Sequence, residues 1–214
     1  MSKIISVEEA VSHVKDGMTI MIGGFLAAGT AIKVVEALAN KGVKDLTLIA
    51  NDTAYPGKGI GMLIANHQIK KLIVSHIGTN ADTIQQFNDK TLDIEFAPQG
   101  TLAERIRCGG SGLGGVLTKT GLGTVVEEGK RKIEINGEEY LLEMPLHADV
   151  AIIGASVCDE MGNSIYYGTT QNFNPMMATA ADLVIVETKE LVPTGSISVE
   201  AVHTPGVYVD YIVK

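Results

Sequence analysis

The sequence predicts an α/β protein in which a mostly parallel β-sheet is flanked by helices. Two observations predict it: short apolar runs of strand length alternate with helical stripes of apolar residues, and no polar low-complexity tract interrupts them. The chain has 214 residues, 45% of them hydrophobic, which is enough to bury a substantial core. Because no proline- or serine-rich linker and no internal repeat divides the chain, we expect residues 1–214 to form a single domain.

The first helix and the first strand are predicted close to the N-terminus. Residues 6–9, Ser-Val-Glu-Glu, have the spacing of a capping box, so a helix should begin after Ser6, and Gly17 should end it. Residues 18–22 form a continuous apolar run, which is typical of a strand that is covered on both faces. This run ends at Gly23.

The next segments repeat the alternation. A helical stripe over residues 32–39 closes near Gly42, and residues 46–50 form a second buried run. Strands that alternate with helices imply right-handed crossovers and a parallel sheet, whose ligands bind beyond the carboxyl ends of the strands. Further strands are predicted at 72–74 and 92–96, and the loops at the carboxyl edge begin at Gly23, Asn51, Ser75 and Ala97.

The second half of the chain has a different pattern. Residues 109–124 contain seven glycines. After them, Asn136-Gly137 separates two short strand-like runs at 132–135 and 138–142, the pattern of a two-residue hairpin with a type I′ turn. Buried-strand runs return at 149–154 and 182–187, so we expect a β-hairpin inserted late in the domain.

The composition excludes several classes of function. The formal net charge of −8 is opposite to the basic surface that a non-specific nucleic-acid binder needs. No apolar run approaches the roughly 18 residues of a membrane span, and residues 1–6 show no secretory leader. Two cysteines, Cys108 and Cys158, are too few for a disulfide framework. We therefore expect a cytoplasmic protein that binds neither nucleic acid nor membrane.

Three further patterns lack the context that their chemistry needs. The glycines of residues 110–115 have dinucleotide-binding spacing, but they follow a helical segment where a strand should stand. Residues 154–158 resemble a nucleophile elbow but end in Cys158 instead of glycine. The five histidines have no metal-ligand spacing, so we expect no metal site.

Three stretches at the carboxyl edge are candidate functional sites. The amides of Gly23-Gly24-Phe25 could converge on an anion; alternatively, this is a tight turn with Phe25 packed in the core. Gln99 could stabilise a carbonyl oxygen as it becomes an oxyanion, or it could cap the helix that begins near Thr101. His76 could act in a site or make a structural hydrogen bond. The residues alone leave these alternatives open.

Taken together, these stretches resemble a known family. Residues 16–29, DGMTIMIGGFLAAG, are similar to the α-subunit signature of the family I CoA-transferases (3-oxoacid CoA-transferases), and especially to that of acetoacetate/butyrate:acetate CoA-transferases. The signature ends in Gly-x-Pro, whereas Ala31 stands here, which removes rigidity but no reactive group. Further similar stretches, spread over nearly the whole chain, are 48–53, 98–102, 105–110, 118–124, 172–175 and 204–206.

The resemblance implies a fold of the CoA-transferase (isomerase-like) type and a ping-pong reaction. CoA would move from a short-chain acyl-CoA to a 3-oxoacid or short-chain fatty acid such as acetoacetate, through a glutamyl-CoA thioester. In the family the nucleophilic glutamate belongs to the β subunit, in a Ser-Glu-Asn-Gly motif that this chain lacks. The resemblance therefore implies that the partner is a CoA-transferase β subunit, in an α2β2 assembly. CoA would be a substrate, and no cofactor would be tightly bound.

The resemblance also implies the roles of the site residues. Gln99 would help to stabilise the oxyanion. The alternative is a non-catalytic module of the same fold that binds a sugar phosphate or CoA without a partner. A dinucleotide-binding enzyme is disfavoured by the context of residues 110–115. The loop that would bind CoA or the acyl group consists of Gly23, Gly24, Phe25, Leu26, Ala27, Ala28, Gly29 and Thr30.

Overall fold

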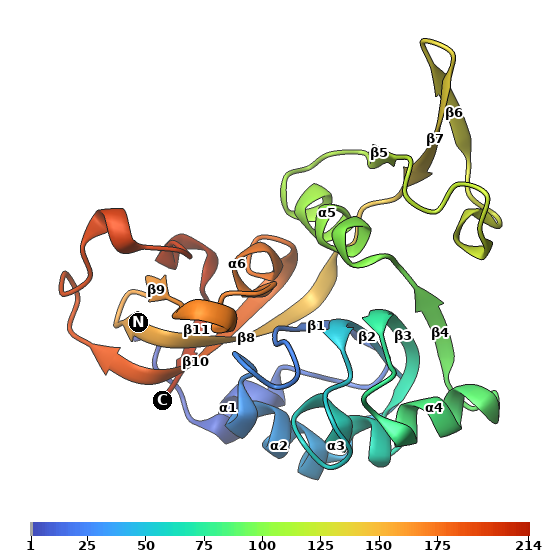
Figure 1. Ribbon diagram of the computed structural model, residues 1–214. Coiled ribbons are helices and arrows are strands. Elements are labelled where there is room, and N and C mark those ends of the chain that lie inside the picture. Colours follow the sequence, from blue (N-terminus) through green and yellow to red (C-terminus); the bar gives the residue numbers. More distant parts are fainter. Residues whose placement is uncertain (1) are drawn as a thin grey trace.

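The main sheet of the protein has eight strands (Figure 1), as seen in a computed structural model that describes residues 2–214. Seven strands lie in the order β11-β10-β8-β1-β2-β3-β4 and are all parallel, while β9 pairs antiparallel with β8. The predicted mostly parallel sheet is confirmed. The strands are β1 (Thr19–Ile22), β2 (Leu46–Asp52), β3 (Ile69–His76), β4 (Asp93–Phe96), β8 (Ala148–Asp159), β9 (Ser164–Ile165), β10 (Ala181–Val192) and β11 (Tyr211–Val213).

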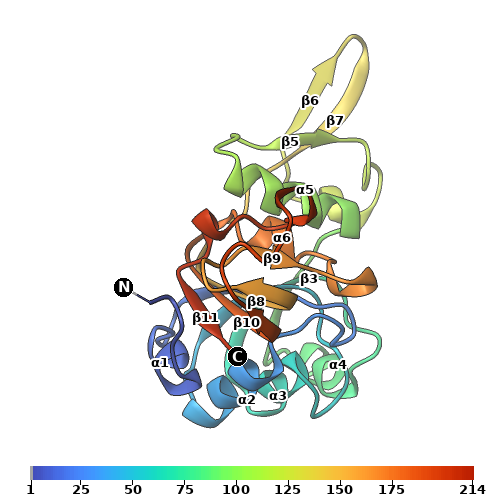
Figure 2. The same cartoon turned by 90° about the vertical axis from the view of Figure 1, so that its left-hand side faces the viewer.

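Helices cover both faces of this sheet (Figures 1 and 2), with α1 to α4 on one face and α5 and α6 on the other. Alternate residues of a strand point to opposite faces. Ile20 and Ile22 of β1 therefore pack with the first group of helices, and Met21 packs with the second group. The helices are α1 (Val7–Ser12), α2 (Ile32–Lys41), α3 (Ile60–Ala65), α4 (Ala81–Asn88), α5 (Gln99–Gly110) and α6 (Asn174–Met177).

The strand order determines where the functional loops lie. The chain runs outward from β1 through β2 and β3 to β4, returns to β8 on the other side of β1, and continues outward through β10 and β11. In open α/β sheets the crevice beyond the carboxyl ends, at the point where the order reverses, is the usual ligand site. The loop of residues 23–30, which follows β1, lies at this point.

A second, antiparallel sheet with the order β5-β7-β6 follows α5, and its β6–β7 hairpin projects away from the main sheet (Figure 1). Asn136 (φ 53°) and Gly137 (φ 80°) form the turn, with the left-handed backbone of type I′. The predicted hairpin is confirmed; the pattern did not predict β5, its third strand. These strands are β5 (Val116–Thr118), β6 (Lys132–Ile135) and β7 (Glu138–Glu143).

An ion cluster joins α5 to the main sheet and to β7 of the second sheet, where Nε of Arg105 lies 3.9 Å from Oε2 of Glu143. The Arg105 side chain, only 8% exposed, pairs with Glu95 of β4 at 2.7 Å and donates from Nε to the Met144 carbonyl at 2.9 Å. Lys71 of β3 contacts the other oxygen of Glu95 at 3.0 Å. Burial raises the pKa of Glu95, but the two cations outweigh this and hold it below the ordinary 4.5.

Some element boundaries differ from the prediction. The Ser6 hydroxyl does cap α1, accepting the Glu9 amide at 3.1 Å, but α1 ends at Ser12; Gly17 has a left-handed backbone in the turn before β1. Strand β2 continues through Asp52, because pairing with β3 extends to Asp52 and His76. Strands β8 and β10 are both 12 residues long, since their mutual pairing continues beyond the predicted runs.

Four short 3-10 helices complete the described secondary structure: Val125–Glu127, Gly168–Thr170, Val199–Ala201 and Gly206–Tyr208. Cys108 and Cys158 are free and buried. Within residues 2–214, every helix is too short or too polar to cross a membrane.

Candidate functional site

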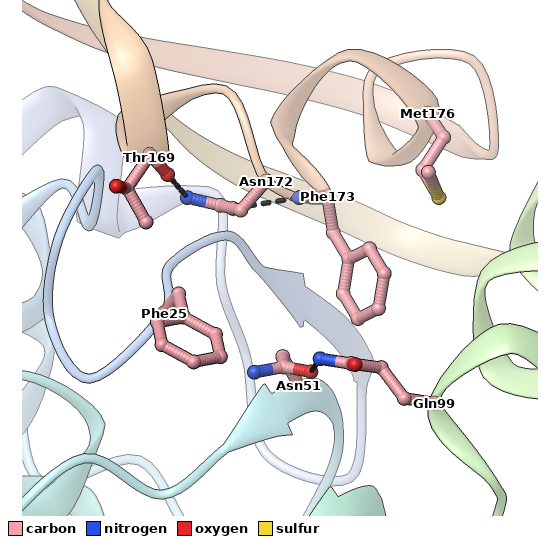
Figure 3. Close-up of a pocket in the computed structure, with 7 residues that line it drawn as sticks. All are labelled: Phe25, Asn51, Gln99, Thr169, Asn172, Phe173 and Met176. Carbon is pink, nitrogen blue, oxygen red and sulfur yellow. Dashed lines mark hydrogen bonds between the residues drawn. The ribbon is translucent and has the colours of Figure 1, made fainter.

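Two adjoining cavities lie at the carboxyl edge of the sheet, and they share Phe25, Asn51 and Gln99. We call the first, of about 310 Å³, the apolar lobe (Figure 3) and the second, of about 340 Å³, the polar lobe. Besides the shared residues, the apolar lobe is lined by Thr169, Asn172, Phe173 and Met176, and the polar lobe by Leu26, Asp52, Ser75, His76 and Thr79.

Gln99 is the first residue of α5, and its side chain reaches across to β2. Its Nε2 donates to Oδ1 of Asn51 at 2.7 Å (Figure 3). The side chain therefore does not cap α5, whose N-cap is Pro98, and the capping alternative is wrong. A primary amide carries two N–H donors, and the bond to Asn51 uses one of them. The other is left for a group in the cavity.

Asn51 is the side chain that orients Gln99. It lies next to the end of β2 and is 3% exposed. Its Oδ1 also accepts from the Ser75 hydroxyl at 3.1 Å, and its Nδ2 donates to Oδ2 of Asp52 at 2.8 Å. Bonds on both ends of the amide fix its rotamer, and the position of the Gln99 donor is fixed with it.

Residues 25–28 form a tight two-residue turn within the predicted binding loop. The amide and carbonyl of Phe25 bond those of Ala28, at 3.0 and 2.9 Å. The two residues between them, Leu26 (φ 49°) and Ala27 (φ 73°), both have a left-handed backbone, as in a type I′ turn. Such turns favour asparagine and glycine, so Leu-Ala at these positions is strained. Contacts with residues outside the turn must therefore stabilise this conformation.

Two polar side chains from other loops bond this turn. Asn172 accepts the Gly24 amide at 3.0 Å and donates to the Ala28 carbonyl at 3.0 Å, so it bridges the two arms of the turn. Asp52 accepts the Leu26 amide, at the tip, at 3.0 Å. The turn that borders the cavities is therefore held by residues from β2 and from the loop before α6.

The two glycines before the turn serve packing within the protein. A Cβ at Gly23 would lie 1.7 Å from Oδ1 of Asn174, and one at Gly24 would lie 2.0 Å from Oγ1 of Thr30. Both amides are also engaged, with the Ile152 carbonyl at 3.1 Å and with Asn172. The expectation that these amides are free to converge on an anion is therefore wrong.

The other residues of the predicted loop lie in different surroundings. Phe25 is 39% exposed and lines both cavities, so the alternative that it packs in the core is also wrong. Leu26 lines the polar lobe. Ala27 and Ala28 belong to the turn, while Gly29 and Thr30 line a separate cavity of about 250 Å³. The structure thus brings Phe25, Leu26 and Gln99 together, and His76 joins them at the rim, exposed at the end of β3.

The sequence patterns did not single out several residues that build the site. Asp52, Asn172 and the fully buried Asn174 hold the loop that was predicted to bind CoA, and Phe173 and Met176 line the apolar lobe. Asp52 lies within residues 48–53, and Asn172, Phe173 and Asn174 lie within residues 172–175. Both stretches carried the family resemblance, which is the available signal. Among residues 2–214, no group of three or more His, Cys, Asp or Glu side chains is arranged to hold a metal ion.

Comparisons with known proteins agree with the fold and show the family. Residues 4–214 match the family model described as Coenzyme A transferase. The chain is 60% identical over 213 residues to the acetoacetyl-CoA:acetate/butyrate CoA transferase alpha subunit of Clostridium acetobutylicum, covering 100% of this chain and 98% of that protein. It is 51% identical to the acetate CoA-transferase alpha subunit of Escherichia coli, covering 99% of this chain and 96% of that one.

The fold is also that of a solved enzyme. The crystal structure of glutaconate coenzyme A-transferase from Acidaminococcus fermentans superposes with a TM-score of 0.88 at 21% identity, over 99% of this chain and 75% of that one. At this identity the superposition shows the fold alone. The family model that matches residues 4–214 and the 60% identity to a curated alpha subunit show that the chain belongs to the coenzyme A transferase family.

Proposed function

We propose that this chain is the α subunit of a heteromeric enzyme, folded as a single domain, and that the enzyme moves CoA between a short-chain acyl-CoA and acetoacetate or a short-chain fatty acid. The observation that carries the proposal is the 60% identity, over essentially the full length of both chains, to an alpha subunit whose name states this reaction class. The apolar lobe, walled by Phe25, Phe173 and Met176, suits a short alkyl chain.

The reactive carboxylate comes from the partner subunit. Among the described residues, Asp52 is the carboxylate that lines the site, in the polar lobe, and both of its oxygens accept hydrogen bonds from this chain. A carboxylate held in this way is a poor nucleophile, because attack would break those bonds. This arrangement supports a reaction in which a glutamate of the β subunit forms the glutamyl-CoA thioester.

Gln99 supplies a hydrogen-bond donor for the thioester carbonyl. When a carboxylate attacks the thioester, charge develops on the carbonyl oxygen, and a donor fixed beforehand stabilises that charge. The Nε2 of Gln99 is fixed by its bond to Asn51, and its second N–H is free for this role. Neutral donors of this kind act without a metal ion or a cationic side chain.

The proposal is tested by locating the covalent intermediate. The purified chain is mixed with its β partner and acetyl-CoA or butyryl-CoA, with no acceptor acid, and both chains are weighed by intact-mass spectrometry. We expect a CoA adduct on the β chain alone, and formation of acetoacetyl-CoA when acetoacetate is added. An adduct on this chain, or no transfer with both subunits present, would overturn the proposal.

A calorimetric titration separates the enzyme from a non-catalytic binding module. A module of that kind binds CoA or a sugar phosphate as an isolated chain, and its affinity does not change when the β partner is added. The proposed enzyme is expected to bind acyl-CoA more tightly in the heteromer than as the isolated chain. Equal affinity in both, together with no transfer, would favour the module.

A further inference from the structure

Asp52 makes an unusual set of contacts for a residue at the end of a strand. It is 4% exposed, and its two oxygens bond different backbone amides: Oδ2 accepts from Leu26 at 3.0 Å and Oδ1 from Ala54 at 2.7 Å. Both partners are non-glycine residues with a left-handed backbone, with φ of 49° for Leu26 and 53° for Ala54. One carboxylate thus holds two strained residues in separate loops.

The strain at Leu26 makes this contact consequential. Left-handed backbone is unfavourable for residues with a Cβ, and residues 25–28 place two of them, Leu26 and Ala27, side by side. Asn172 bonds the arms of the turn, whereas Asp52 bonds the tip. Hydrogen bonds to a charged acceptor are stronger than neutral ones, so a buried carboxylate is well suited to hold this conformation.

The same carboxylate is connected to Gln99. Oδ2 of Asp52 accepts from Nδ2 of Asn51 at 2.8 Å, and Oδ1 of Asn51 accepts from Nε2 of Gln99 at 2.7 Å. A continuous series of hydrogen bonds therefore runs from the tip of the turn through Asp52 and Asn51 to the donor in the cavity. Phe25 in the turn and Gln99 at the end of the series both line the two lobes.

We propose that Asp52 is a positioning residue that sets two walls of the site at once. It holds the strained 25–28 turn directly, and through Asn51 it fixes the orientation of the Gln99 amide. Its effect on catalysis rests on the proposed function. Its effect on the turn does not, because that follows from the hydrogen bonds of this chain alone.

The direct test is Asp52→Asn, which keeps the size of the side chain and removes its charge and one acceptor. In the full chain, we expect the Leu26 amide to exchange with solvent at least about tenfold faster by NMR, as for one lost hydrogen bond to a charged group. In the heteromer, we expect Asp52→Asn to lower kcat, as Gln99→Ala does. The loss of kcat in the double variant should be smaller than the product of the two single losses. Unchanged exchange at Leu26 would overturn the proposal.

A rescue experiment distinguishes positioning from a general need for Asp52. Leu26→Asn with Ala27→Gly supplies the residue pair that a type I′ turn favours, so the turn no longer depends on Asp52. We expect Asp52→Asn to lower Tm and turnover less in this background than in the native sequence. Equal losses in both backgrounds would overturn the proposal. If Asp52→Asn alone fails to fold but folds in this background, the coupling is demonstrated directly.

Asp159 offers a matched control. It is 2% exposed and, like Asp52, accepts hydrogen bonds from two backbone amides and one asparagine side chain. The backbone amides are those of Met161 and Asn163, and the side chain is that of Asn163. Asp159→Asn should lower Tm without changing the exchange of Leu26 or the turnover of the heteromer. If the native heteromer transfers no CoA, the proposed function fails, while the exchange and Tm measurements still decide the role of Asp52.

Discussion

The Nε2 of Gln99 and the Oδ1 of Asn51 lie 2.7 Å apart, joining the start of α5 to the end of β2 across 48 residues of sequence. The bond leaves the Gln99 amide one free N–H and a fixed orientation. An exposed glutamine on a helix would otherwise sample several rotamers, and a donor that must be reorganised during the reaction stabilises an oxyanion poorly. This contact therefore supports the use of Gln99 as a prepared donor.

Replacing Gln99 with alanine should impair the chemical step. We expect Gln99→Ala to lower kcat of the heteromer by about 10²-fold, the usual cost of one lost oxyanion donor. Steady-state kinetics with acetoacetate and an acyl-CoA measure the effect. Gln85→Ala is the control, because Gln85 on α4 also donates to a side-chain oxygen, that of Asp89 at 2.8 Å, and lines neither lobe. A loss of only two- or threefold for Gln99→Ala would show that its assignment is wrong.

A side chain at position 24 should disturb the loop of residues 23–30, which we propose binds CoA. Gly24 has φ of 142°, and an added Cβ would lie 2.0 Å from Oγ1 of Thr30. We expect Gly24→Ala to lower the free energy of unfolding by about 1–3 kcal/mol, as for a residue forced into a disfavoured conformation, and to raise KM for acyl-CoA. Thermal unfolding and kinetics of the heteromer measure the two effects.

Gly100→Ala is the matched control for that substitution. Gly100 is the second residue of α5, next to Gln99, and a Cβ there meets nothing within 4 Å. Alanine is favoured over glycine in helices by up to about 1 kcal/mol, so Gly100→Ala should not lower Tm. If both variants lost stability equally, the close approach between Gly24 and Thr30 would not explain the effect.

The ion cluster around Glu95 should make stability depend on pH. Burial raises the pKa of Glu95, but Arg105 and Lys71 outweigh it and hold the pKa below 4.5 in the folded chain. The ionised group therefore stabilises the fold above about pH 4.5, and this contribution is lost as the pH falls through the lowered value. We expect Glu95→Gln to have a lower Tm than the native chain at pH 7.

The pH profile of that difference is the decisive measurement. The two Tm values should converge below pH 4.5, where Glu95 of the native chain takes up its proton. Glu138→Gln is a suitable control, since Glu138, the first residue of β7, is exposed and pairs with Lys119, which follows β5. Surface pairs of this kind contribute little. A Tm difference for Glu95→Gln that stayed constant between pH 3 and pH 7 would contradict the assignment.

The cysteines should be inert in the native chain. Burial raises the pKa of Cys158 to about 11, and both thiols are covered, with Cys108 1% and Cys158 0% exposed. Alkylation requires an accessible thiolate. We expect iodoacetamide at pH 8 to leave both unmodified in the native chain and to modify both in denaturant, as measured by mass spectrometry. Rapid modification of the native chain at Cys158 would contradict the described packing.

Much of the fold could be predicted because its signals are local. The apolar run at 18–22, the stripe at 32–39 that ends at the left-handed Gly42, and the Asn136-Gly137 turn each depend on neighbouring residues alone. These patterns correctly predicted β1, α2 and the hairpin. They located ends poorly where pairing decides the length: Asp52 became part of β2 because His76 of β3 pairs with it.

The same distinction between local and long-range signals applies to the site. Position in the sequence was enough to bring the loop after β1 and the segment that contains Gln99 to one edge of the sheet, since the carboxyl ends of parallel strands meet there. Only the tertiary structure decided what fills the space over Gly23 and Gly24, and which side chains hold residues 25–28. Asn172 lies 148 residues from Gly24, and its contact depends on the return of the chain to β8 beside β1. A hydrogen bond between loops forms only when strand order has brought both loops together, and no local pattern encodes that order.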